Sequence, residues 1–167
     1  MPLDFPLRGD RLDLRPFVEA DLEAMHRVYG DPEVMRHVGE GGAVTREESA
    51  RMLAAYREHQ AQHGFAFWAV CDRATGTLIG DAGLEVTADG VELGYTLARA
   101  SWGRGLATEA ARLCVAAAFG PLGLTRLLAV ADVDHPASAR VLTRLGFVED
   151  AEVIAYGRAH RRFVLER

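Results

Sequence analysis

The chain has 167 residues, 49% of them hydrophobic, which suits one domain over residues 1–167 whose core needs no disulfide. Its formal net charge of −5 argues against a nucleic-acid partner, which would require a basic face or stripe. The longest apolar run, Leu113–Phe119, is too short to cross a bilayer and the N-terminus lacks a signal-peptide pattern, so we expect a cytoplasmic protein without a membrane partner.

The first third of the chain predicts one strand and two helices. Alternating residues over Arg11–Phe17 predict a short strand, and apolar residues then recur at helical spacing over Val18–Tyr29 until Gly30-Asp31-Pro32 ends the pattern. A second helix is predicted from Thr45, because Thr45 and Glu48 form the Thr-x-x-Glu pattern of a capping box.

The middle of the chain predicts three strands and a helix. Phe65–Asp72 and Thr77–Leu84 have the pattern of a buried hairpin, and Val91–Leu97 follows as a third strand after an Asp-Gly turn. The next helix begins at Leu106, and its single apolar stripe ends at Gly120-Pro121.

The last part of the chain predicts a strand, a helix and two more strands. Thr125–Asp132 is the strand, and the helix begins at Pro136 and ends with Gly146 at the left-handed C′ position. Phe147–Ala155 and Arg158–Leu165 are the final strands. This order of elements indicates a mixed α/β (α+β) fold rather than a doubly wound one.

The segment Trp102–Ala110 predicts an anion site, because a glycine-rich turn there enters a helix directly after a strand. Gly103 and Gly105 lack a Cβ, so the backbone can adopt left-handed angles and a ligand can approach its N–H groups. The first N–H groups of the helix have no internal partner and suit a phosphate or pyrophosphate. All 19 basic residues are arginine, so phosphate contacts have to come from arginines and backbone amides.

Cysteine and histidine spacing does not indicate a metal site. Cys71 and Cys114 lie within apolar patterns, so we expect buried, reduced thiols. The histidines of the N-terminal half have no partner at metal spacing, and we expect them on the surface: His26, His37, His59 and His63.

The order of elements, the segment Trp102-Gly103-Arg104-Gly105-Leu106-Ala107 and the stretch Ser138–Phe147 together resemble the GCN5-related N-acetyltransferase (GNAT) superfamily over nearly the whole chain. Four further stretches resemble its RimJ/RimL ribosomal-protein acetyltransferase branch: Arg11–Pro16, Asp31–Met35, Leu93–Tyr95 and Ala107–Ala110. The resemblance implies the GNAT fold, a central mixed, mostly antiparallel, splayed sheet of about seven strands with about four flanking helices.

The resemblance implies acetyl-CoA, or another short acyl-CoA, as cosubstrate. In the family, the pyrophosphate lies on backbone amides of the segment matching Trp102–Ala107, and the pantetheine arm pairs with the strand matching Gly94–Leu97. The residues implied to bind it come from that strand, the glycine turn and the last helix: Tyr95, Thr96, Leu97, Trp102, Gly103, Arg104, Gly105, Leu106, Ala107, Thr108, His135, Ser138 and Arg144.

One position departs from the family pattern. Relatives usually carry Asn-x-x-Ser at the start of the last helix, whereas this chain reads His135-Pro136-Ala137-Ser138. Histidine can donate from a ring nitrogen but caps a helix poorly, so Asp134 is the alternative cap and the role of His135 stays open.

Amide formation from a thioester requires a neutral amine and therefore a proton acceptor. A lysine side chain has a pKa of about 10.4 and an α-amino group about 8, so the α-amino group needs less help. Glu92 is the candidate base, because it lies on the strand expected to carry the thioester and the family often uses an acidic residue there. Asp132 and Asp134 are the substitutes, and a solvated or ion-paired carboxylate is the alternative for Glu92.

The developing oxyanion and the departing thiolate need hydrogen-bond donors. Backbone N–H groups near Thr96 and Leu97 are candidates for the oxyanion. Ser138 matches the serine proposed as the acid in RimL-like relatives, with helix capping as its alternative role, and Tyr156 is the rival acid. The basic run His160-Arg161-Arg162 replaces an acidic residue that many relatives carry in the final hairpin.

The sequence thus predicts an acyl-CoA-dependent N-acetyltransferase that acts by direct attack of a primary amine in a ternary complex. Two cysteines in the core disfavour an acyl-cysteine intermediate. The acceptor stays open between a protein N-terminal α-amine and a small-molecule amine, as does the choice between monomer and homodimer. The glycine-containing loop Val38–Val44 is either a lid or an ordinary exposed loop. A non-catalytic acyl-CoA sensor or interaction module is the alternative function.

Overall fold

The computed structural model describes residues 1–167 and contains one eight-stranded sheet in the order β1-β2-β3-β4-β5-β6-β8-β7. Neighbouring strands are antiparallel except β5 and β6, which are parallel. The strands are β1 (Leu7–Arg8), β2 (Leu12–Arg15), β3 (Phe67–Asp72), β4 (Leu78–Thr87), β5 (Gly90–Leu97), β6 (Arg126–Asp132), β7 (Val148–Ala155) and β8 (Arg158–Glu166).

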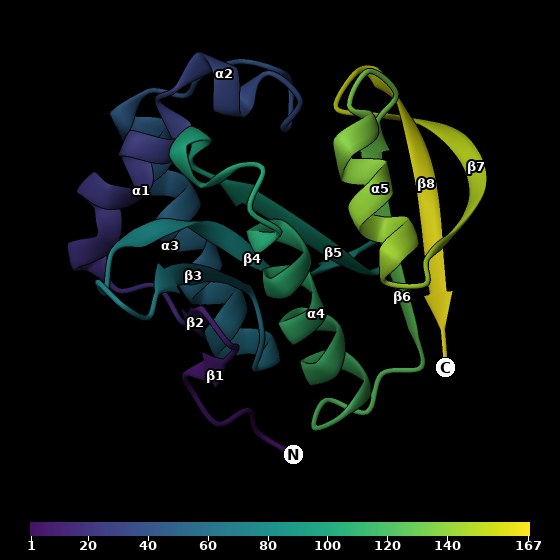
Figure 1. Cartoon of the computed structure of the whole chain (residues 1–167), viewed down its shortest axis with the longest axis horizontal. Coiled ribbons are helices and arrows are strands. Elements are labelled where there is room, and N and C mark those ends of the chain that lie inside the picture. The colour runs from purple at the N-terminus through teal and green to yellow at the C-terminus, as the bar shows by residue number, and fades with distance from the viewer.

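Five α-helices cover the sheet, with α4 and α5 on one face and α1 and α3 on the other (Figure 1). They are α1 (Leu22–Tyr29), α2 (Pro32–Met35), α3 (Arg46–His63), α4 (Leu106–Phe119) and α5 (Pro136–Arg144). Short 3-10 turns precede α1 at Glu19–Asp21 and follow β5 at Arg99–Ser101. No helix has the length and apolar character that crossing a membrane requires.

The sheet separates two hydrophobic clusters. The larger one packs under α4 and α5, and the smaller one packs under α1 and α3. Successive residues of β3 face the two clusters in turn: Trp68 and Val70 lie in the first, Ala69 and Cys71 in the second. This alternation is the reason why β3 reads as apolar on both faces.

Local signals in the sequence fix the ends of two helices. Thr45 Oγ1 accepts a hydrogen bond from the Glu48 N–H and Glu48 Oε2 accepts one from the Thr45 N–H, each at 3.2 Å, which confirms the capping box. Past α5, Gly146 has φ +95°, and the N–H groups of Gly146 and Phe147 donate back to the last turn of the helix at 3.1 and 3.0 Å. This Schellman arrangement confirms Gly146 as the C′ residue.

The predicted α/β class and mixed sheet are confirmed, with one strand and one helix more than the sequence predicted. β1 has two residues and α2 has four, so neither is long enough to show a periodic pattern. The Gly30-Asp31-Pro32 sequence that ends α1 also begins α2, because the Asp31 carboxylate accepts a hydrogen bond from the Glu33 N–H at 3.0 Å.

β5 and β6 diverge after one paired position. Glu92 and Leu128 form their only ladder pair, whereas β4 and β5 pair at eight positions and β6 and β8 at seven. From Leu93 to Leu97, β5 therefore has no strand along one edge, although it lies in the middle of the sheet. The gap between the two strands contains the candidate site.

Candidate active site

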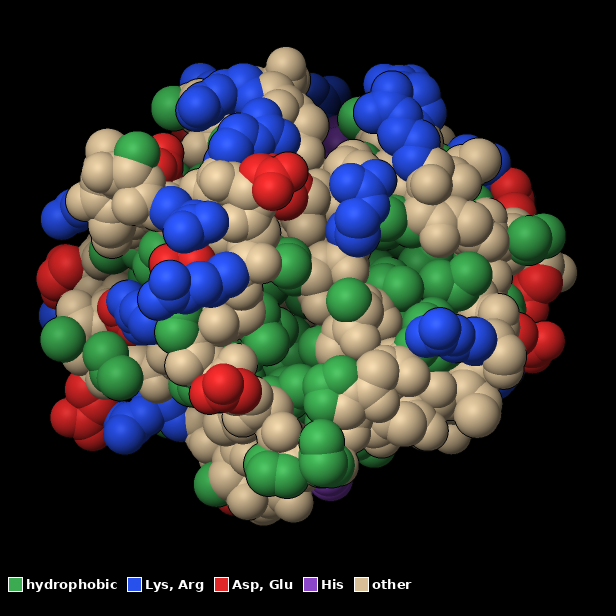
Figure 2. Space-filling view, turned by 60° about the horizontal axis from the view of Figure 1, so that its bottom comes forward, with side chains coloured by type: hydrophobic (Ala, Val, Ile, Leu, Met, Phe, Trp, Pro, Cys, Tyr) green, Lys and Arg blue, Asp and Glu red, His purple; other side chains and the backbone are tan.

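A cleft of about 720 Å³ opens where β5 and β6 diverge. Its walls come from β5, the end of β6, the turn before α4, the first turn of α4, the length of α5, and the segment that follows α2. Figure 2 shows one face of the molecule, where hydrophobic side chains gather in a hollow and arginine side chains are scattered around it. The cleft volume lies within the roughly 300–1,000 Å³ that small-molecule sites occupy.

The glycine turn before α4 presents open backbone amides to the cleft. Gly103 has φ +72° and Gly105 has φ +75°, and Gly105 is the N-cap residue of α4 without a side-chain cap hydrogen bond. No atom lies within 4 Å of the place that a Cβ would take at Gly103, so its need for glycine is conformational rather than steric. The first N–H groups of α4 are therefore available to an anion, as the sequence predicts.

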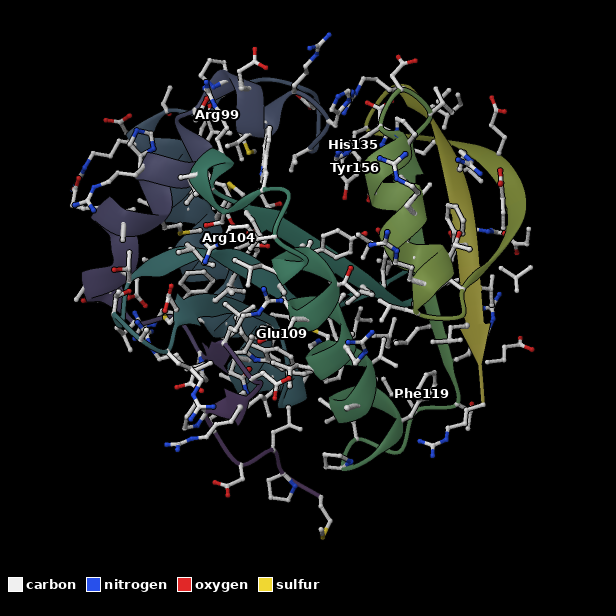
Figure 3. The ribbon with its side chains drawn as sticks, in the orientation of Figure 1. Arg99, Arg104, Glu109, Phe119, His135 and Tyr156 are labelled. Carbon is white, nitrogen blue, oxygen red and sulfur yellow. The ribbon has the colours of Figure 1, made fainter.

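Arg11 and Glu109 connect this turn to the start of β2. The Glu109 carboxylate accepts hydrogen bonds from the backbone N–H groups of Arg11 and Leu12 and from the Arg11 side chain, all at 2.9 Å. The Arg11 guanidinium also donates to the carbonyl of Arg104, within the turn, at 2.7 Å. Two of the predicted motif segments thus fix the position of the glycine turn. Figure 3 labels Arg104, in the turn, and Glu109, on α4.

The free edge of β5 presents amide groups of alternate residues. The Ala98 N–H donates to the Ile79 carbonyl at 2.7 Å, next to the ladder between β4 and β5. Antiparallel alternation therefore turns the amides of Thr96 and Gly94 toward β4 and those of Leu97 and Tyr95 toward the gap. Consistent with this, the Leu97 carbonyl accepts a hydrogen bond from the Trp102 indole at 2.9 Å.

The first turn of α5 faces β5 across the cleft. The Tyr95 hydroxyl lies 3.0 Å from Ser138 Oγ and 3.1 Å from the Ser138 carbonyl oxygen, and burial raises the Tyr95 pKa to about 12. His135 is the N-cap residue and makes no side-chain cap hydrogen bond, so neither His135 nor the alternative, Asp134, caps α5 in this way. Ser138 therefore has a phenol, rather than a cap, as its hydroxyl partner.

Two carboxylates face the cleft from paired positions of β4 and β5, namely Glu85 and Glu92. Burial raises the pKa of Glu92, and the nearby charges of Glu85 and Asp89 raise it further. A carboxyl group with a raised pKa is better matched to proton transfer near neutral pH than an exposed one.

Tyr156 lies at the turn between β7 and β8 with φ +53°. This left-handed conformation is an outlier for a bulky residue, and Gly157 follows it at φ +73° as in a type I′ turn. The side chain is 54% exposed, and burial together with the charges of Glu92 and Glu85 raises its pKa. Figure 3 labels Tyr156 beside His135, near the start of α5.

A buried carboxyl group lies deeper in the same cleft. Asp81 on β4 is 3% exposed and is hydrogen-bonded by the Tyr29 hydroxyl of α1. Burial raises the Asp81 pKa to about 8, although a hydrogen bond from the Thr96 backbone lowers it. Asp81 is therefore mostly protonated near neutral pH.

His37, directly after α2, also lines the cleft. Its Nδ1 lies 3.2 Å from Asp132 Oδ2 at the end of β6, and its ring stacks on His135 with centroids 4.5 Å apart and planes at 17°. Burial acts to raise the Asp132 pKa, but hydrogen bonds from Asp134 and His37 and the charge of Arg158 outweigh it and lower the pKa. Asp132 is thus a carboxylate at neutral pH.

Arg158 of β8 holds the loop that follows α2. Its guanidinium pairs with Asp132 and donates to the carbonyls of Arg36 at 3.3 Å and Gly39 at 2.8 Å. The loop that the sequence predicted as a lid or an exposed loop is therefore tied to the end of β6 and to β8.

The acetyltransferase (GNAT) domain family matches residues 11–148. YoaA of Bacillus subtilis, an uncharacterized N-acetyltransferase, is 32% identical over 157 residues, which is 91% of this chain and 88% of YoaA. The chain belongs to the GNAT acetyltransferase family.

Solved GNAT structures share this fold. An acetyltransferase from Agrobacterium tumefaciens is 25% identical, with a TM-score of 0.85 over 100% of this chain and 98% of the other. The ribosomal L7/L12 α-N-protein acetyltransferase RimL, solved with coenzyme A, superimposes with a TM-score of 0.77 over 95% of each chain. At 16% identity, the likeness to RimL is one of fold.

GNAT acetyltransferases use acetyl-CoA, and the residues of this cleft fit such a molecule. The glycine turn and the start of α4 suit its pyrophosphate, the free edge of β5 suits the amides of its pantetheine arm, and Arg140 and Arg144 of α5 line the same cleft. Acetyl-CoA binding in an acetyltransferase therefore explains the gap between β5 and β6.

All of the predicted site residues except Arg104 line the cleft. The Arg104 side chain is exposed, and its carbonyl is bound by Arg11 instead. Of the two substitute bases, Asp134 does not line the cleft, and both oxygens of Asp132 already accept hydrogen bonds.

The basic run of the final hairpin is mostly neutralised outside the cleft. Arg161 pairs with Glu149 at 2.6 Å and Arg162 with Asp150 at 2.9 Å, whereas His160 is buried and lines the cleft.

Sequence reasoning missed Asp81 and His37 as cleft residues. The available signal for Asp81 was its position as an acidic residue within an apolar strand of the predicted hairpin. The predicted surface position is wrong for His37, whose side chain is 21% exposed and packs between Asp132 and His135. Cys71 and Cys114 are buried and unpaired, as predicted.

Proposed function

We propose that this acetyltransferase moves the acetyl group of acetyl-CoA to a primary amine by direct attack in a ternary complex. The observation that carries this proposal is the cleft itself, which has an anion cradle and a free strand edge on one side and the carboxyl groups of Glu85 and Glu92 on the other. A cationic amine is the acceptor that such carboxyl groups favour.

The donor is held by backbone groups more than by side chains. Gly103, Gly105 and the first amides of α4 bind the pyrophosphate, with Arg140 and Arg144 as the cations that line the cleft. The edge amides of β5 hold the pantetheine arm as a partial extra strand. When bound, acetyl-CoA supplies the thioester carbonyl that the amine attacks and the thiol that leaves.

Three groups of the chain complete the reaction. Glu92 accepts a proton from the attacking nitrogen, because it is the buried carboxylate at the closed end of the gap. The Leu97 amide, which faces the gap, is the favoured backbone donor for the oxyanion. Ser138 protonates the thiolate, supported by its contact with Tyr95, and Tyr156 is the rival acid.

Direct attack is favoured over a covalent intermediate. Burial raises the pKa of both cysteine thiols, and Cys114, on the inner face of α4, is completely buried, so neither presents a nucleophilic thiolate to the cleft. Unpaired buried thiols also suit a reducing compartment such as the cytoplasm.

The acceptor belongs to one of two classes. A protein N-terminal α-amine is the class that the RimL name describes for that structural neighbour, and its pKa of about 8 makes it easier to deprotonate than a lysine side chain. A small-molecule amine is the other class, because the cleft volume of about 720 Å³ is large enough to hold one.

The test uses purified protein, acetyl-CoA and a panel of N-terminal peptides and small amines, with free CoA thiol as the readout. We expect thiol release with one class of amine. Acetyl-CoA at 100 times its dissociation constant should also stabilise the fold by about 2.7 kcal/mol. Stabilisation without turnover on any amine would favour the acyl-CoA sensor, and absence of stabilisation would overturn the donor assignment.

A further inference from the structure

The proposed reaction has to remove two protons from the acceptor nitrogen. The amine arrives as R–NH3⁺, loses one proton before it can attack, and loses a second after the C–N bond has formed. The departing thiolate takes up one proton, so the balance is R–NH3⁺ + CH3CO–SCoA → CH3CO–NHR + HSCoA + H⁺. One proton therefore has to travel from the ammonium group to solvent.

We propose that His37, oriented by Asp132, takes this first proton from the acceptor ammonium and releases it to solvent, a role that rests on the proposed acetyl transfer. The ionised Asp132 can only accept a hydrogen bond, so the 3.2 Å contact places the hydrogen of neutral His37 on Nδ1. Nε2 is then left with a lone pair, and no protein group hydrogen-bonds to it. The first proton moves to Nε2, and Asp132 stabilises the imidazolium that forms.

The surroundings of His37 suit a group that exchanges protons with solvent. His37 lines the cleft and also a second cavity, whose other lining residues are all charged: Arg36, Asp132, Asp134 and Arg158. Its side chain is 21% exposed, whereas that of Asp132 is 4% exposed. A proton taken up from the cleft can therefore leave toward the polar side.

Other charged groups of the cluster are less suited to this step. Both Asp132 oxygens already accept hydrogen bonds, from His37, Arg158 and the Asp134 N–H, so Asp132 acts as a positioning residue. Burial, and then the charge of His37, lower the pKa of His135, which keeps the stacked ring neutral. Glu92 lies at the closed end of the gap and remains the acceptor of the second proton.

The experiment measures kcat and KM for the best acceptor of the amine panel from pH 6 to 9 in His37→Ala, His37→Gln and Asp132→Asn. His63→Gln is the matched control, because His63 is an exposed histidine at the end of α3 that does not line the cleft. The dissociation constant of acetyl-CoA is measured in parallel, and imidazole is added to His37→Ala as an external base.

We expect kcat/KM at pH 7 to fall about 100- to 1,000-fold in both His37 variants, with acetyl-CoA affinity within about twofold of wild type. Imidazole should raise the kcat/KM of His37→Ala at least about tenfold. In both His37 variants, raising the pH toward the pKa of the acceptor amine should raise the rate about tenfold per pH unit, since the neutral amine then forms without a base. The kcat/KM of Asp132→Asn should fall too, and imidazole should not restore it.

Three results would overturn the role of His37: full activity in His37→Gln, a change in KM alone, or a loss that neither imidazole nor higher pH repairs. The last two would assign His37 a structural role in holding the loop. A wild-type protein that binds acetyl-CoA but turns over no amine would instead refute the proposed function, so the two failures are distinguishable.

Discussion

Glu109 and Arg11 lie 98 positions apart in the chain, yet the Glu109 carboxylate binds the backbone and the side chain of Arg11 at once. The same guanidinium reaches the Arg104 carbonyl in the glycine turn. The start of β2 therefore holds the donor-binding turn in place, although neither side chain lines the cleft.

Glu109→Gln should weaken acetyl-CoA binding without altering the chemistry. Charge-assisted hydrogen bonds contribute about 1.5–3 kcal/mol, so we expect a loss of about 2 kcal/mol in the free energy of unfolding and roughly tenfold weaker acetyl-CoA binding. Urea unfolding and calorimetric titration measure these quantities. Glu152→Gln, an exposed glutamate of β7, is the control, and equal effects in both variants would refute the role of Glu109.

Gly103→Ala should weaken acetyl-CoA binding, whereas Gly123→Ala should not. Both glycines have positive φ, +72° and +64°, and at neither would an added Cβ have an atom within 4 Å, so alanine should destabilise the fold at each by about 1–2 kcal/mol. Only Gly103 lines the cleft. If both variants bound acetyl-CoA equally well, the turn would not be the anion cradle.

Asp81→Asn should make the free energy of unfolding less sensitive to alkaline pH. The folded pKa of about 8 lies above the ordinary value of 3.8, so the stabilisation by protonated Asp81 is complete below about pH 4 and is lost as the pH rises through 8. For one proton, the slope is at most about 1.4 kcal/mol per pH unit. Urea unfolding from pH 5 to 9 should show a falling free energy for wild type and a flatter curve for Asp81→Asn. Parallel curves would contradict a protonated Asp81.

Glu92→Gln should lower kcat with little change in acetyl-CoA affinity. Loss of a positioned base slows proton transfer by about 100- to 10,000-fold, and glutamine keeps the shape of the side chain. Steady-state kinetics against Glu152→Gln measure the effect. Unchanged kcat would mean that Glu92 is not the base.

Ser138→Ala and Tyr156→Phe distinguish the two candidate acids. We expect the larger fall in kcat in Ser138→Ala, because Ser138 lies across the cleft from the free edge of β5 and contacts Tyr95. A leaving group more acidic than the CoA thiol should reduce that defect, since it departs without protonation. The opposite ranking of the two variants would assign the acid role to Tyr156.

Local features of the sequence predicted much of the fold. The Thr45 capping box, the Gly146 helix end and the positive φ values of Gly103 and Gly105 depend on residues a few positions apart, so a sequence pattern suffices to predict them. β1 and α2 were missed because two and four residues are too short for periodicity to appear.

The acceptor side of the site could not be predicted in the same way. His37 and Asp132 are 95 positions apart, and Tyr29 and Asp81 are 52 apart, so their contacts depend on how helices pack on the sheet. A histidine in a polar stretch looks the same in sequence whether it faces solvent or a buried carboxylate. The donor side, by contrast, is built from backbone amides of one continuous segment, which a glycine pattern reveals.

The lone Glu92–Leu128 pair has a mechanical consequence. Strands β1–β5 form one hydrogen-bonded half of the sheet, and strands β6–β8 form the other. The two halves are joined mainly by side-chain packing beneath α4 and α5. A bound pantetheine arm would act as a temporary strand that links the two halves of the sheet. Amide hydrogen exchange along Leu93–Leu97 should therefore slow when the donor binds. Release of the thiol product would reopen the gap between β5 and β6 for the next cycle.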